Sequence, residues 1–180
     1  MPLLIAVLGG GLVGCGSDPA RDVDSGQGRA SSGSPEPDST SMPPWPAPSD
    51  VPARVADAGL ALGAMGMAEH YHPELRIIVN GTDVPVPANI GVDPDTGAMS
   101  AVHTHERDGT VHIEASTAGE RFTLGQVFTE WGVTLTRTQI GGVKAKPGQQ
   151  MRVTSNGVPV AGDPKDLRLA PDQKIVLRLP

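Results

Sequence analysis

This sequence contains one cysteine, few aromatic residues and no run of basic side chains. A single cysteine, Cys15, cannot form a disulfide within the chain, so cysteine usage does not indicate a redox compartment. The chain has 14 basic and 20 acidic residues, a net charge of −6, and only 3% aromatic residues. Because nucleic-acid recognition needs a basic surface, commonly with aromatic residues, nucleic acid is not expected as a partner.

The apolar segment from Leu3 to Val13 is shorter than the roughly 20 residues of a membrane-spanning helix, and its length suits the core of a signal peptide. It leads into Leu12-Val13-Gly14-Cys15. These residues resemble the lipobox of bacterial lipoproteins, in which small residues precede a cysteine. The resemblance implies a signal peptide over residues 1–14 and a lipid-modified Cys15. It also implies that Cys15 anchors the chain in the bilayer of a bacterial cell, on the extracytoplasmic side.

The next segment, residues 15–52, is rich in serine, proline, glycine and acidic residues and has almost no side chains to bury. Such a composition does not offset the entropy that ordering costs, so we expect a flexible tether. Residues 53–180 are long enough for one modest core and are expected to form a single domain.

Two turn signals within the predicted domain indicate β-hairpins. Leu75, Ile77 and Val79 alternate along the chain, and Asn80-Gly81 follows them, which predicts a hairpin over residues 75–86. Prolines in its returning strand favour an edge position. A second hairpin is expected around Asn156-Gly157, with strands near 151–154 and 158–160, before a last strand over residues 174–179.

One helix is predicted to begin after Thr123. Thr123 and Gln126 have the spacing of a capping box, and Gly132 stands where a left-handed residue would end the helix. Between them an apolar stripe is expected to face the core; it contains Leu124, Val127, Phe128 and Trp131. Residues 50–62 receive no firm assignment. A helix between two hairpins predicts an α+β fold, with a small mixed or antiparallel sheet and one packed helix, possibly β-grasp-like.

All five histidines lie between His70 and His112, and the densest group occupies residues 103–114. With Asp108-Gly109 as a two-residue hairpin loop, His105 would lie opposite His112 and His103 opposite Glu114. Because side chains alternate along a strand, these four ligands would share one face. The opposite face, with Val102, Val111 and Ile113, is expected to be buried.

His70 and His72 point the same way in an extended segment, so they are expected to complete this site or to support its ligands. Imidazole with carboxylate suits zinc, Cu(II) or Fe(II), whereas thioethers suit Cu(I). Met65, Met67 and Met99 are possible soft ligands. Copper is therefore favoured over zinc, with iron third.

Three function classes are consistent with these residues. The leading hypothesis is a membrane-anchored, extracytoplasmic lipoprotein for metal capture, delivery or sensing. The second is a small mononuclear metalloenzyme of hydrolase or oxygenase type, with an open coordination position and Glu106 or Glu69 as a base. The third is a non-metal interaction module on the cell surface.

Overall fold

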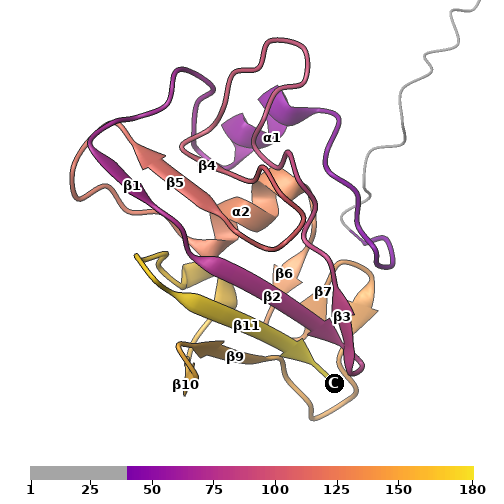
Figure 1. Ribbon diagram of the computed structural model, residues 1–180. Helices are drawn as coiled ribbons and strands as arrows, with labels where there is room; N and C mark the ends of the chain where they lie inside the picture. The colour runs from indigo at the N-terminus through magenta and orange to yellow at the C-terminus, as the bar shows by residue number, and fades with distance from the viewer. Residues whose placement is uncertain (1–39) are drawn as a thin grey trace, which may run out of the picture. The chain divides into compact units, whose positions relative to one another are not determined.

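The alternating segment at Leu75 lies inside a five-stranded mixed sheet. The structure is a computed structural model that describes residues 40–180 (Figure 1). Strand β11 (Lys174–Leu179) is parallel to β2 (Glu74–Val79), and the other neighbouring strands are antiparallel. The order across the sheet is β10 (Val158–Pro159), β9 (Arg152–Ser155), β11 (Lys174–Leu179), β2 (Glu74–Val79) and β3 (Thr82–Val84).

Both predicted hairpins of this sheet are confirmed. Asn80 and Gly81 have positive φ angles of 50° and 83°, and Asn156 and Gly157 have 50° and 78°. Two successive positive φ angles define the type I′ turn, which matches the twist of antiparallel strands. Strand β3 lies at the edge of the sheet, as the prolines that follow it predicted.

Helix α2 (Leu124–Trp131) is also confirmed, with both ends at the predicted residues. The Thr123 hydroxyl accepts a hydrogen bond from Gln126 N–H, and the Gln126 side chain accepts one from Thr123 N–H. Gly132 ends the helix at φ 73°. The predicted apolar stripe is buried, so α2 packs its apolar face into the core.

The order of these elements confirms the predicted α+β fold. A first hairpin (β2 and β3), helix α2 and a second hairpin (β9 and β10) precede β11, which pairs with both hairpins at the centre of the sheet. The sheet is mixed, as the sequence predicted, with β11 parallel to β2 and antiparallel to β9. Figure 1 shows β2 and β11 side by side.

A second sheet of three short strands follows the order β1 (Glu69–Tyr71), β5 (His112–Ala115), β4 (Val102–His103). Both neighbours of β5 are antiparallel to it. Only His72 and Pro73 separate β1 from β2, so one extended segment passes from the small sheet to the large one. Pairing of β1 with β5 places His70, the histidine of β1, beside the histidine-bearing strand β5.

Several short elements were not predicted. Helix α1 (Val51–Asp57) buries only Val51 and Val55 and packs against α2. A seven-residue helix is too short to show an apolar period, and it depends on tertiary packing. The other elements are the 3₁₀ helix η1 (Pro164–Asp166) and a third sheet of two-residue strands, β6 (Leu135–Thr136), β7 (Gln139–Ile140) and β8 (Val143–Lys144).

The packed part of the chain begins before residue 53. Trp45 is 2% exposed, lies edge-on to Trp131 with ring centroids 5.8 Å apart, and donates its indole N–H to the Ser41 carbonyl. The expected tether therefore ends earlier than residue 52. Cys15, the expected signal peptide over residues 1–14 and the tether up to residue 39 lie outside the described residues. Within residues 40–180, no helix is both long and apolar enough to cross a membrane.

Candidate metal centre

The register of the histidine hairpin differs from the predicted one. His103 of β4 lies opposite His112 of β5, and Val102 lies opposite Ile113. The prediction that His105 faces His112 and that His103 faces Glu114 is therefore wrong by two residues. A shift of two preserves the face on which each side chain lies, whereas a shift of one would have reversed it.

The physical reason is a long-range pairing of the predicted loop. Leu75 N–H donates to the Gly109 carbonyl, and Val111 N–H donates to the Pro73 carbonyl. Asp108 accepts a hydrogen bond from Thr110 N–H, which forms a local Asx turn instead of a two-residue hairpin loop. A side chain at residue 109 would clash with the Leu75 carbonyl oxygen, and φ is 90° there, so this close approach requires glycine.

Four of the predicted ligands nevertheless share one face of the small sheet. His112 and Glu114 are two residues apart on β5, so their side chains lie on the same face of the sheet. On the neighbouring strands, His103 of β4 lies opposite His112, and His70 of β1 lies opposite Glu114. On the other face Val102 and Ile113 are fully buried, as predicted. His72 and His105 lie just beyond the strands. We refer to His70, His72, His103, His105 and His112 as the five-histidine cluster.

His103 anchors an inner triad with His105 and His112. Its side chain is 0% exposed, and its Nδ1 lies 2.8 Å from the Ser100 carbonyl oxygen. A carbonyl can only accept, so Nδ1 carries the proton and Nε2 keeps its lone pair. His105 Nε2 lies 3.1 Å from this nitrogen and donates a hydrogen bond to it, a proton that an ion bound by both rings would displace. Two imidazole nitrogens bound to one tetrahedral zinc ion lie about 3.3 Å apart, which this separation nearly matches.

His112 stands at the centre of the cluster. Its ring stacks on His103 at 5.3 Å and meets His105 edge-on at 4.7 Å. It also meets His72 edge-on at 4.5 Å. His70 and His72 complete an outer triad with His112, and in each triad the candidate ligand atoms all lie within 4.8 Å of one another. Three imidazoles at this separation can hold Zn(II) or Cu(II) and leave a coordination position open.

Two carboxylates flank the cluster. Glu114 is buried, and its Oε1 lies 3.4 Å from His70 Nε2. Glu106 is exposed, and its Oε2 lies 3.5 Å from His112 Nε2. Both distances are longer than good hydrogen bonds. Among the described residues, neither Glu114 Oε2 nor His112 Nε2 has a hydrogen-bond partner although both are buried. Glu114 is therefore a possible additional ligand beside the outer triad, and Glu106 a possible base.

Burial keeps the central histidines uncharged. Removal from water lowers the pKa of His103 from 6.5 to about 4, and the neighbouring His105 adds to the shift. Burial also lowers the pKa of His112, with contributions from His72 and His105. At neutral pH both rings are neutral, the form in which imidazole binds a metal.

The methionines occupy different surroundings. Met65 and Met99 line a small cavity of about 190 Å³ that Glu114 also lines. Met67 is 91% exposed to solvent. The donor set that the structure gathers most closely is therefore imidazole, with thioethers at the neighbouring cavity.

Glu130 is a buried residue that the sequence analysis did not single out. It lies on α2 and is 0% exposed, and within residues 40–180 no group satisfies either carboxylate oxygen with a good hydrogen bond. Burial raises its pKa from 4.5 to about 8, and the Ser100 side chain opposes this shift. Glu130 follows Val127 by three residues and therefore lies on the apolar stripe of α2. A charged residue on an apolar stripe was the sequence signal that could have identified it.

This burial predicts a pH-dependent stability. The folded protein retains a proton on Glu130 that the unfolded chain releases above pH 4.5, so the free energy of unfolding falls as pH rises towards about 8. Glu130→Gln cannot ionise and is expected to stabilise the protein at pH 8 by about 2 to 4 kcal/mol, with little effect at pH 4. Urea denaturation at both pH values measures this, and equal effects at both would show that ionisation is not the cause.

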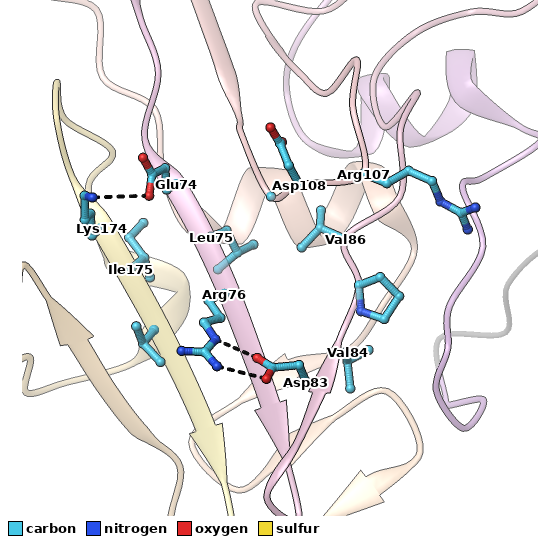
Figure 2. Close-up of a pocket in the computed structure, with 13 residues that line it drawn as sticks. Glu74, Leu75, Arg76, Asp83, Val84, Val86, Arg107, Asp108, Lys174 and Ile175 are labelled. Carbon is cyan, nitrogen blue, oxygen red and sulfur yellow. Dashed lines mark hydrogen bonds and ion pairs between the residues drawn. The ribbon is translucent and has the colours of Figure 1, made fainter.

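Two depressions in the described part of the chain lie away from the histidines. One, of about 630 Å³, covers strands β2, β3 and β11 beside the Arg107–Gly109 loop (Figure 2). Two exposed ion pairs line it, Arg76 with Asp83 at 2.6 Å and Lys174 with Glu74 at 3.7 Å, together with Arg107 and Asp108 of the loop. The charges within each ion pair offset each other, and exposed pairs contribute little free energy. The five-histidine cluster is therefore the better candidate for function.

Fold and site together define a small α+β domain that carries a five-histidine cluster on one face of a three-stranded sheet. No protein-family model, curated protein or solved structure matches the chain. The evidence for its function therefore comes from the residues of the chain itself.

Proposed function

We propose that this chain is a membrane-anchored, extracytoplasmic lipoprotein that binds one transition-metal ion through His103, His105 and His112. Capture, delivery or sensing of the ion would be its role. The observation that carries the proposal is the convergence of His103 Nε2 and His105 Nε2, 3.1 Å apart, with a ligand atom of His112 within 4.8 Å of both. A buried His103 held by the Ser100 carbonyl gives this site a fixed ligand before the ion arrives.

Copper is favoured over zinc, and zinc over iron. For a given set of nitrogen ligands, Cu(II) binds more tightly than Zn(II), and both bind more tightly than Fe(II). The thioethers of Met65 and Met99 at the adjoining cavity add donors that suit Cu(I).

Titration of the full chain with Cu(II), Cu(I), Zn(II) and Fe(II), against competing chelators, tests the proposal. We expect one ion per chain, with copper bound most tightly and a dissociation constant well below about 10 μM. His103→Asn should weaken binding strongly, and Thr110→Ala should not, because Thr110 lies in the loop outside the cluster. Absence of binding tighter than about 10 μM for all four ions would overturn metal binding and favour the interaction module.

The membrane anchor follows from the lipobox resemblance at Cys15. Cys15→Ala is expected to move the protein from the membrane fraction of a bacterial cell to the soluble extracytoplasmic fraction. If the variant stays with the membrane, the proposed lipid anchor is wrong, although the metal site would be unaffected.

One observation favours a metalloenzyme as the second candidate. Glu106 is exposed and its Oε2 lies 3.5 Å from His112 Nε2, so a carboxylate would be close to an ion that His112 helped to bind. Such a base could accept a proton from metal-bound water. Hydrolysis of an activated ester by the zinc-loaded chain, lost in Glu106→Gln with metal binding intact, would support this role.

A further inference from the structure

The five-histidine cluster contains two triads that meet at one residue. The inner triad is His103, His105 and His112, and the outer triad is His70, His72 and His112. Five imidazoles exceed the four ligands of a tetrahedral ion. One ion therefore leaves at least one imidazole of the cluster uncoordinated, and the arrangement of the remaining rings decides what they do.

The two triads differ in exposure and in support. His70 is 57% exposed, and His72 is also exposed to solvent. The inner triad contains the fully buried His103, whose ring is held by the Ser100 carbonyl. A ligand that is already oriented loses less entropy when it binds, so the inner triad is the tighter position. In the outer triad, both histidines other than the shared His112 are exposed to water.

His112 connects the two positions. Its ring centroid lies 4.7 Å from that of His105 on the inner side and 4.5 Å from that of His72 on the outer side. The rings of His70 and His72 are themselves 4.6 Å apart. An ion could therefore exchange inner for outer ligands one at a time while His112 stays bound. Two dications that shared one imidazole would repel each other, which favours a single ion.

From this we propose that His70, His72 and His112 form a second, exchange position for the same ion, through which it reaches and leaves the inner triad. This inference rests on the proposed function, because it presupposes that the inner triad binds a metal. Glu114 supports the outer position, since its carboxylate lies 3.4 Å from His70 and its other oxygen is buried without a hydrogen-bond partner in the described part of the chain. A carboxylate there would offset part of the charge of an arriving cation.

The experiment compares the full wild-type chain with His70→Asn/His72→Asn, using Cu(II) as the probe and EDTA in excess as the acceptor. We expect one copper per chain in both proteins. Loading by Cu(II) and release to EDTA, followed by visible absorption in stopped flow, should both slow by about tenfold or more in the double variant. Because both rates fall together, the dissociation constant should change much less. Glu74→Gln, an exposed change outside the cluster, is the matched control and should keep the wild-type rates.

A second variant identifies the outer position itself. His103→Asn/His105→Asn retains only the outer triad and should bind one copper more weakly and exchange it faster than wild type. Its electron paramagnetic resonance spectrum should match that of wild-type protein frozen early during loading, before the final spectrum develops. Thermal unfolding without metal verifies that each variant is folded.

Distinct outcomes separate this inference from the proposed function. If the wild-type chain binds no copper, the proposed function fails. If it binds one copper tightly but the His70→Asn/His72→Asn variant loads and releases copper at wild-type rates, the exchange position fails and the proposed function stands. Two coppers per wild-type chain at saturation would also overturn the exchange position, because the triads would then be separate sites. A large loss of affinity without slower exchange would make His70 and His72 ligands of the final ion.

Discussion

His112→Asn is expected to cause the largest loss of metal affinity of any single substitution in this chain. His112 is the only residue that both triads share, and its ring contacts those of His103, His105 and His72. Its removal leaves two ligands in each triad, so no three-imidazole site remains. We expect copper affinity to fall by at least about a hundredfold. Competition titration against a chelator of known affinity measures the loss.

The folded state should tolerate this substitution. His112 is only partly buried, and its Nε2 lacks a hydrogen-bond partner among residues 40–180, so asparagine leaves no group newly unpaired. The free energy of unfolding without metal should stay within about 1 kcal/mol of wild type. His70→Asn alone is the matched comparison, because it removes an imidazole from the outer triad only. Equal losses of affinity in both variants would contradict the central role of His112.

Trp131→Ala is expected to cause the largest loss of stability. The ring is 0% exposed and packs against Phe128 at 5.5 Å and edge-on against Trp45 at 5.8 Å. Its indole N–H donates to the Pro46 carbonyl at 2.9 Å. Truncation leaves a cavity and an unpaired carbonyl, so we expect a loss of about 3 to 5 kcal/mol in the free energy of unfolding. Chemical denaturation of the metal-free protein measures it.

A control variant and a proteolysis experiment test whether this loss of stability comes from the packing of Trp131. Val158→Ala removes methyl groups from an exposed strand residue and should change stability by less than about 0.5 kcal/mol. Because Trp131 holds the segment around Trp45, the Trp131 variant should also become sensitive to proteolysis in residues 40–50. A Trp131→Ala protein of unchanged stability that loses metal would instead place this ring in the metal site.

The elements of this fold that could be predicted from sequence are those whose conformation depends on a few residues adjacent in the chain. Asn80-Gly81 and Asn156-Gly157 adopt the positive φ angles of type I′ turns because asparagine and glycine tolerate them. Thr123 and Gln126 cap α2 because their spacing satisfies two backbone N–H groups at the start of a helix. The alternation of side chains likewise assigned Val102 and Ile113 to the buried face and His103 and His112 to the opposite face.

The packing of the first residues depended on contacts distant in sequence. Composition before residue 53 predicts no order, yet Trp45 is buried because Trp131 offers a ring beside it and Ser41 a carbonyl for its indole N–H. Helix α1 has only two buried residues, so its stability depends on α2. Local patterns do not contain these partners, and weak segments are ordered by the surface on which they pack.

From sequence alone, the residue types and their strand faces determined that imidazoles would gather on one side of a hairpin. Only the tertiary structure decided which histidines meet. The pairing of residues 109–111 with 73–75 set the register of β4 and β5, and it placed His103, instead of His105, opposite His112. The same pairing brought β1, and with it His70, to the open edge of β5. Backbone hydrogen bonds between segments more than 30 residues apart overrode a local turn preference, because a turn signal specifies neighbouring φ angles and carries no information about distant partners.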